Sequence, residues 1–303
     1  MLLAVAIGAA AHAQPNQCAA CHPSQVENHG ATRHAKALRP AAKSDFAQAL
    51  PMAPLGEARG GFLLSYDRKG AALEVTAVRE GAAPARATID WVFGAGDQGV
   101  TPVARIGQRW LEHRISYYPR RDRFDLTLGH QPGLSKSAEA AIGIEQSPST
   151  IRNCFGCHAT VSADLEVKRA GVECIRCHPG ASEHARGMGA PVNPAKVPAA
   201  EQLGICAECH RLTPPNGNTT DPMNVRFQPL RLALSKCYRA GKLVCTTCHP
   251  AHEDARKADA AFYREKCLQC HASPHRIKED CAGCHMPKSS PAPYLSFSDH
   301  FIR

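Results

Sequence analysis

The chain has 303 residues, a formal net charge of +9 at neutral pH and 15 cysteines. Beyond the first residues no apolar run is long enough to cross a bilayer, which argues against a membrane-spanning protein. The lysines and arginines are scattered and not clustered with aromatic residues, so the basic charge does not predict binding to nucleic acid.

The N-terminal run MLLAVAIGAAAHAQ is short and apolar and ends in the small-x-small pattern Ala11-His12-Ala13. This pattern predicts a signal peptide over residues 1–13, although the basic residues that usually begin such a peptide are missing. An apolar helix that stays on the chain is the alternative. We therefore expect a secreted, soluble protein of the bacterial periplasm or cell exterior.

A Cys-x-x-Cys-His motif occurs seven times and uses fourteen of the fifteen cysteines. Only Cys237 stands outside the pattern. The motifs are Cys18/Cys21/His22, Cys154/Cys157/His158, Cys174/Cys177/His178, Cys206/Cys209/His210, Cys245/Cys248/His249, Cys267/Cys270/His271 and Cys281/Cys284/His285.

The histidine that follows every cysteine pair distinguishes haem attachment from three other uses of paired cysteines. Zinc knuckles, redox dithiols and disulfide frameworks use paired cysteines but do not require it. The full motif is the attachment signal for haem c: two thiols on one helical turn form thioethers, and the next residue places its imidazole on the iron. We predict seven covalent haem c groups, whose propionates would offset much of the positive charge.

The spacing of the motifs predicts a divided chain. We expect an N-terminal haem segment over 14–58, an antiparallel β insertion over 59–130 and a six-haem domain over 131–303. Alternating or β-branched runs predict strands at 61–67, 71–78, 85–93, 109–119 and 123–128, with their aromatic residues Trp91, Phe93, Trp110, Tyr117 and Tyr118 in the core. The expected fold class is mostly irregular chain and short α-helices wrapped around a haem chain, with a small β insertion that touches it.

Eight histidines remain outside the motifs and the signal peptide, close to the number that bis-histidine coordination of seven irons requires. They are His29, His34, His113, His130, His184, His252, His275 and His300. Three of these follow a motif too closely to cross to the far face of their own haem, so each is expected to serve a neighbouring haem. One of His29, His113 and His130 is expected to complete the set, with His130 preferred.

Four stretches resemble multihaem c-type cytochromes with doubled motifs, relatives of the tetrahaem cytochrome of nitrifying bacteria. These stretches are CAACHPSQVENHGATRHAKAL, ECIRCHPGASEH, LSKCYRAGKLVCTTCHPAHE and the ending CAGCHMPKSS...FSDHFIR. DWVFGAG, ISYYP and CFGCHAT resemble a subgroup with a β insertion between the first two haems. The resemblance implies electron transfer through haem, with distal ligands at His34, His184, His252, His275 and His300. No Cys-x-x-Cys-Lys motif, typical of pentahaem nitrite reductases, is present.

The expected function is transfer of electrons through a chain of closely packed, mainly bis-histidine haems. The expected partners are redox proteins or neighbouring cytochromes, and the chain is expected to be an electron carrier and not an enzyme. Two alternatives remain: a subunit of an extracellular cytochrome filament, or an oxidoreductase with one open haem site. Cys237 is predicted to be a buried small side chain, a thiolate near a haem iron or an intermolecular link.

Overall fold

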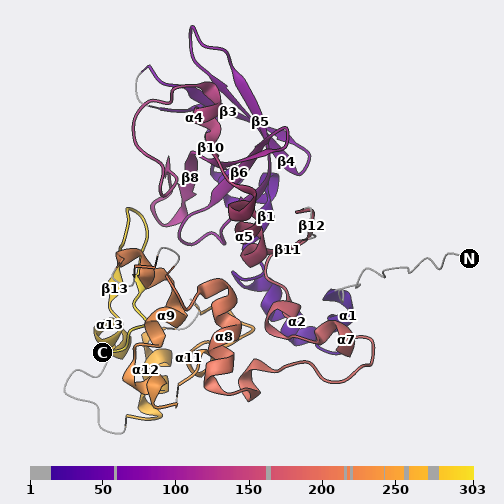
Figure 1. Ribbon diagram of the computed structural model, residues 1–303, viewed down its shortest axis with the longest axis vertical. Helices are drawn as coiled ribbons and strands as arrows, with labels where there is room; N and C mark the ends of the chain where they lie inside the picture. Colours follow the sequence, from indigo (N-terminus) through magenta and orange to yellow (C-terminus); the bar gives the residue numbers. More distant parts are fainter. Residues whose placement is uncertain are drawn as a thin grey trace, which may run out of the picture.

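The computed structural model describes residues 15–57, 60–161, 165–214, 217–218, 221–241, 243–255, 259–271 and 280–303. The predicted signal peptide and His275 lie outside the described residues. Strands gather at one end of the molecule and short helices at the other (Figure 1). None of the described helices is long and apolar enough to cross a membrane.

The strand-rich end is built on one curled, antiparallel sheet of eight strands. Seven of them follow the order β10-β7-β6-β5-β4-β3-β2, and β1 pairs with β5. The strands are β1 (Leu38–Pro40), β2 (Leu55–Gly56), β3 (Leu63–Lys69), β4 (Ala72–Val78), β5 (Ala85–Phe93), β6 (Thr101–Ile106), β7 (Arg109–His113) and β10 (Gly143–Glu145). A separate hairpin pairs β8 (Ile115–Tyr118) with β9 (Arg123–Leu126).

The predicted fold class was wrong, because the chain is a mixed α/β structure with a large sheet and not a helical haem wrap with a small insertion. Three strands, β1, β2 and β10, are only two or three residues long. Such segments carry no alternation for a sequence pattern to detect, and their pairing depends on partners far along the chain. The predicted strand over 109–119 is two strands, β7 and β8, which belong to different sheets.

The inner face of the sheet encloses a hydrophobic core of its own. Leu73, Val75 and Ile89 alternate inward along β4 and β5 and are fully buried. Phe46 of α3 (Asp45–Ala49) is also fully buried, and its ring lies 5.6 Å from that of Tyr66. Helix α4 (Ala138–Ile142) covers the sheet beside β4. This unit therefore has apolar packing of the kind that stabilises a domain without a cofactor.

A second apolar cluster joins the sheet to a helix that carries one of the Cys-x-x-Cys-His motifs. Helix α5 (Pro148–His158), which carries the second motif, packs Phe155 against Phe93 and Trp110, with ring centroids 5.0 and 5.5 Å apart. Leu38 and Val103 belong to the same cluster. Phe93 and Trp110 thus pack between the sheet and the helix that carries the second motif.

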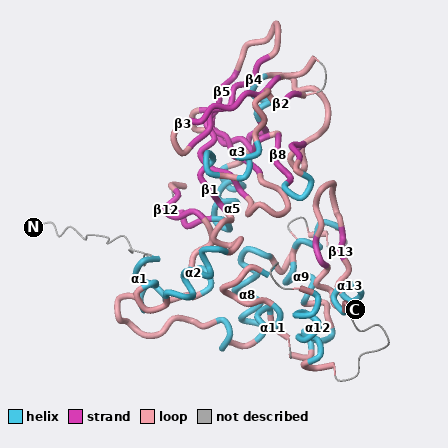
Figure 2. The backbone as a smooth tube through the Cα atoms, turned by 180° about the vertical axis from the view of Figure 1, so that it is seen from behind, coloured by secondary structure: helices cyan, strands magenta, loops and turns pink. Residues whose placement is uncertain are grey.

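The other end consists of short helices joined by irregular chain, as the tube in Figure 2 shows. Four 3-10 turns lie along the described chain: η1 (Ala41–Lys43), η2 (Pro119–Arg121), η3 (Pro194–Lys196) and η4 (Pro222–Arg226). The remaining helices are α1 (Pro15–Ala19), α2 (Pro23–Ala31), α6 (Cys174–Cys177), α7 (Ala181–His184), α8 (Ala199–His210), α9 (Gln228–Leu232), α10 (Lys236–Arg239), α11 (Cys245–Cys248), α12 (Ala260–Leu268) and α13 (Cys281–His285). Two small hairpins accompany them: β11 (Ala159–Val161) with β12 (Val167–Ala170), and β13 (Lys288–Ser289) with β14 (Phe297–Ser298).

Candidate haem centres

Each motif includes a turn of helix. The N–H of the motif histidine donates to the carbonyl of the first cysteine, at 2.8 Å for His22, 2.9 Å for His178 and 3.0 Å for His249. This i to i+4 bond places the two thiols of a motif, three positions apart, on the same side of the turn. The local geometry therefore suits attachment of both thiols to one edge of a porphyrin.

The protein covers the fourteen motif cysteines unequally. Ten of them are partly buried, and the other four are exposed. Each exposed residue is the second cysteine of its motif: Cys21, Cys177, Cys270 and Cys284. All four were predicted to attach haem. A porphyrin joined to such a thiol would itself cover it, so their role in attachment stays a prediction.

Four motif histidines lie opposite a histidine from another part of the chain. The ring centroids of the four pairs are 6.0 to 6.5 Å apart. The pairs are His22 with His184, His34 with His210, His178 with His252, and His249 with His300.

This separation fits one metal ion between each two rings. An imidazole nitrogen binds a metal at about 2.0–2.1 Å and lies about 1.1 Å from its ring centre, so two rings on opposite sides of one ion have centroids about 6.2 Å apart. Both ring planes then contain the axis through the metal, so the angle between them is free; it ranges from 13° for His178 and His252 to 77° for His34 and His210. The donor set is therefore the one that bis-histidine haem requires.

Hydrogen bonds at Nδ1 orient several of these rings. The four acceptors are all carbonyl oxygens: Val192 for His178 at 3.0 Å, Gly189 for His184 at 2.8 Å, the Gln228 side chain for His210 at 3.0 Å and Ser298 for His300 at 3.0 Å. A carbonyl accepts only from a protonated Nδ1, so the tautomer leaves the Nε2 lone pair for a metal.

Two of these imidazole rings stay neutral because they are buried. Burial, helped by the neighbouring His210, lowers the pKa of His34 to about 4. Burial, with His249 next to it, lowers the pKa of His300 to about 4 as well. Both imidazoles are therefore unprotonated at neutral pH, which is the state that coordinates a metal.

A charged clamp holds two of the four pairs in place. Arg33, next to His34, donates Nε to Asp254 at 2.8 Å and Nη1 to Asp97 at 2.6 Å. Asp254 lies two residues after His252, and Asp97 is in the β5–β6 loop. No sequence pattern predicts this clamp, because its carboxylates are 221 and 64 positions away from Arg33 and belong to no motif.

The other three motif histidines have different surroundings. His158 donates Nδ1 to the Ala37 carbonyl at 3.0 Å, and the ring it meets is Phe93, 5.2 Å away at 87°. No histidine ring lies against His158 in the described part of the chain. His285 bonds through Nδ1 to the Arg303 carbonyl at 2.5 Å. His271 is exposed and directly precedes residues outside the described ranges.

Three further histidines were ligand candidates from the sequence. His113 is completely buried in the sheet core, where Nε2 bonds to the Tyr66 hydroxyl at 2.7 Å. The His130 side chain is 1% exposed and has Nε2 3.3 Å from a carboxylate oxygen of Glu112. The pKa of His29 on α2 is lowered mainly by burial. None of the three rings is in contact with a motif histidine within the described residues.

Cysteines of different motifs lie beside each other. Four pairs of thiols are close enough to hydrogen-bond: Cys18 with Cys174, Cys157 with Cys209, Cys206 with Cys245, and Cys267 with Cys281. Burial raises the pKa of Cys248 and Cys267, and Cys237 of α10, which is half-buried, is near enough to both to add to this effect. Groups attached at neighbouring motifs would therefore be close in space.

The sequence matches no known protein family model and no curated protein. The chain is similar in structure to the outer cell wall cytochrome OcwA, with a TM-score of 0.55, 12% identity, and coverage of 96% of this chain and 79% of that one. The undecaheme cytochrome from the S-layer of Carboxydothermus ferrireducens also matches, with a TM-score of 0.38 and 13% identity over 88% of this chain and 44% of that one. The first of these matches shows that the fold is similar to that of the outer cell wall cytochrome OcwA.

Proposed function

We propose that this chain attaches seven haem c groups and conducts electrons through them between redox partners. The observation that carries the proposal is the set of four histidine pairs with centroids 6.0 to 6.5 Å apart. Each pair joins a motif histidine to a histidine from a distant segment, and chance contact of imidazoles would not repeat the same spacing four times. Haem bound there would supply a one-electron iron couple at each site.

The distal ligands follow from the pairs. His184 serves the first motif, His252 the third, His34 the fourth and His300 the fifth. Every distal ligand comes from a segment that belongs to another motif, so the chain cross-links its haem sites as it folds. These paired imidazoles would hold each haem iron from two sides, and haem held in this way would supply electron transfer with little rearrangement.

The proximity of cysteines supports a continuous path. Neighbouring thiols link the first motif to the third through Cys18 and Cys174, and the third to the fourth through Cys177 and Cys206. From the fourth motif they reach the fifth, then the sixth and the seventh. The second motif branches from the fourth through Cys157 and Cys209. This gives a path with one side branch next to the sheet.

The place of action is the periplasm or the cell exterior, and the partners are other redox proteins or cytochromes. The predicted signal peptide supports this location, and so does the fold shared with the outer cell wall cytochrome OcwA. Haem c is attached after export, which agrees with it.

The oxidoreductase alternative has one observation in its favour. His158, the histidine of the second motif, faces Phe93 and no histidine ring among the described residues. An iron held by His158 alone would keep a coordination position for a small ligand. Glu112, which acts electrostatically on Cys154 of the same motif, would place an acid-base group near it.

A pair of His184 variants tests the ligand set. His184→Ala should convert one haem from low spin to high spin, whereas His184→Met should keep it low-spin and raise its potential, because a thioether ligand favours the reduced iron. Electron paramagnetic resonance and a potentiometric titration of the holoprotein measure both. A low-spin spectrum unchanged in His184→Ala would contradict the proposal, and an intact mass with four haems or fewer would do so too.

Cyanide separates the two functions. The relay requires no ligand exchange, so the ferric holoprotein should keep at least four haems low-spin and inert to cyanide. The oxidoreductase predicts that one haem equivalent binds cyanide and that His158→Ala removes this site. Absence of any cyanide-binding haem would leave the relay as the function.

A further inference from the structure

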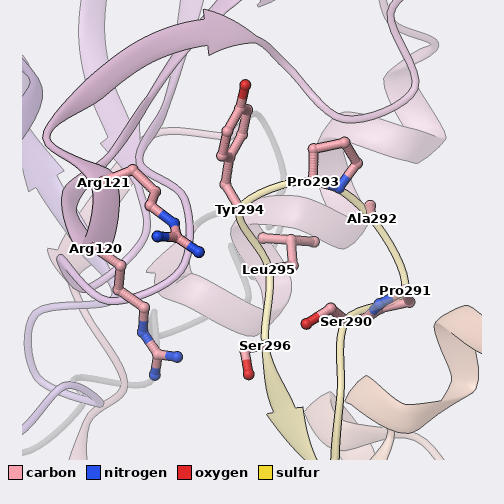
Figure 3. A pocket seen from close by; sticks show the side chains of 9 residues that line it. All are labelled: Arg120, Arg121, Ser290, Pro291, Ala292, Pro293, Tyr294, Leu295 and Ser296. Atoms are coloured by element: carbon pink, nitrogen blue, oxygen red, sulfur yellow. The ribbon is translucent and has the colours of Figure 1, made fainter.

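A cavity of about 750 Å³ lies between the turn η2 and the loop that joins β13 to β14. Figure 3 shows the side chains of Arg120 and Arg121 reaching from η2 towards this loop, with Tyr294, Leu295 and Ser296 on the opposite side. The volume is in the range of sites that bind small molecules. No cysteine or histidine is among the described residues that line it, so it is distinct from the places where haem is attached.

The loop is held in a fixed shape by side chains of the sheet unit. Tyr294 has a left-handed backbone, with φ of 66°, and its ring lies 4.9 Å from that of Tyr118. Its hydroxyl donates to Asp125 at 2.7 Å. The Gln98 amide donates to the Ser296 carbonyl at 2.7 Å and accepts from the Ser296 N–H at 3.0 Å. The cavity wall is therefore formed before any ligand arrives, which lowers the entropic cost of binding.

The lining is positive on one side and apolar on the other. Arg120 shares its charge with Asp97, at 2.9 Å from Nε to Oδ1, whereas Arg121 makes no ion pair with any described residue. The described lining residues include no carboxylate. Pro291, Pro293 and Leu295 supply apolar surface. This combination favours an anion that also has a flat apolar body.

The cavity lies close along the chain to two of the candidate haem centres. The loop is the tip of the β13–β14 hairpin, and an Asp299 N–H bond to the Pro287 carbonyl, at 3.0 Å, closes its base. His285 precedes the hairpin and His300 follows it. Ser290 and Tyr294 are five and six residues from these histidines, so no more than about 20 Å of chain separates the cavity wall from either of them.

We propose that this cavity binds a small aromatic anion carrying sulfonate, phosphate or carboxylate groups. Arg120 and Arg121 would bind the charged groups, and the prolines and Leu295 would cover the ring. This binding does not depend on the function proposed above.

Naphthalene-1,5-disulfonate is a suitable probe, because it carries two fixed charges on a flat ring and is not itself reduced. Calorimetric titration of the ferric holoprotein should show one site. Arg121→Ala should weaken binding about tenfold, the effect of losing one charge-assisted contact. The double change of Arg120 and Arg121 to Ala should abolish it. Arg86→Ala, which removes an equal charge from an exposed position on β5, should leave binding unchanged.

Two results would overturn the proposal. Equal loss of affinity in Arg86→Ala and Arg121→Ala would mean that the probe reads net charge and not this cavity. Sulfate binding as tightly as the disulfonate would mean that the apolar wall plays no part. The ferric protein transfers no electrons in this assay, so failure here leaves the relay untouched, and failure of the relay leaves this result valid.

Discussion

The sheet unit and the helices that carry most of the Cys-x-x-Cys-His motifs are stabilised in different ways. The sheet unit encloses a core around Phe46, Leu73 and Ile89, all of them inaccessible to solvent. After Ala159, and leaving proline and glycine aside, the described residues include only five buried apolar side chains: Leu203, Val225, Phe227, Leu232 and Leu295. The helical end instead holds most of the candidate haem attachments, and its helices α6 and α11 consist only of the four residues from one motif cysteine to the next.

This contrast indicates which interactions replace a core. Ordering the backbone costs about 1–2 kcal/mol per residue, and five buried side chains at about 1.5–3 kcal/mol each do not offset that cost over more than a hundred residues. Covalently attached porphyrins with paired histidines would supply the missing apolar surface and cross-links. The sheet unit has a core of its own and packs against α5.

The largest effect is expected from leaving out haem. In a chain produced without haem attachment, the region after residue 199 should lose its structure while the sheet between β1 and β10 keeps its own. Hydrogen exchange by mass spectrometry compares the two regions in one sample. Slow exchange over residues 199–303 in the haem-free chain would show that the helical end has a core of its own.

Removing a buried ring from the sheet core should have a smaller effect, and this effect should fall on the sheet unit and not on the helical end. Phe46→Ala should lower the free energy of unfolding of the sheet unit by about 3–5 kcal/mol, because the ring is fully buried. The haem spectrum should stay the same. Leu63→Ala on β3 is the control, since that side chain is 48% exposed and should cost little. Loss of low-spin haem in Phe46→Ala would show that the two regions fold as one.

The junction between the regions depends on one glycine. Gly171 has φ of 88°, and a Cβ there would clash with the Ala35 carbonyl oxygen. The backbone at this point joins His34 and His158: Val172 N–H donates to the His34 carbonyl at 2.9 Å and Gly171 N–H to the His158 carbonyl at 3.0 Å. Gly171→Ala should therefore disturb both ligands as well as stability.

The control for this change is Gly107→Ala in the β6–β7 turn. Gly107 also has a positive φ, of 60°, but has open space around it. Gly107→Ala should therefore lower the free energy of unfolding only by the cost of the strained backbone, about 1–2 kcal/mol. The electron paramagnetic resonance spectrum of the holoprotein should change in the Gly171 variant alone. Equal spectra in both variants would mean that the backbone at Gly171 does not position the two histidines.

The smallest effect concerns pH and the sheet. Burial raises the pKa of Glu57, but hydrogen bonds from Ser135 and Phe62 and the charge of Arg114 outweigh it, so the pKa lies below its ordinary value. A lowered carboxyl pKa stabilises the fold above the unfolded pKa, near 4.5, and this contribution is lost as pH falls through the folded value.

Glu57→Gln should therefore destabilise the sheet at pH 7 and flatten its loss of stability between about pH 5 and pH 3. Urea denaturation at several pH values, followed by circular dichroism, measures this. Glu80→Gln, at an exposed turn, should follow the unmodified protein. If the Glu57 variant has the same pH profile of stability as the Glu80 variant, Glu57 does not cause the loss of stability at low pH.

The sequence alone predicted several features that depend on neighbours along the chain. Strands at 72–78 and 85–93 match the predicted runs at 71–78 and 85–93, because side chains two apart share a face. The two thiols and the histidine of each motif follow from one helical turn. The pattern missed β6, whose run TPVARI contains a proline and alternates weakly.

Tertiary structure alone decided which segments meet. The edge strands β1, β2 and β10 enlarge the sheet, and they are too short to carry a pattern. The match of His22 with His184 and of His34 with His210 joins positions far apart in the sequence, as does the clamp of Arg33 on Asp254. These contacts form because tertiary packing places distant segments together. The separation of two residues along the chain does not determine the distance between them in the folded protein.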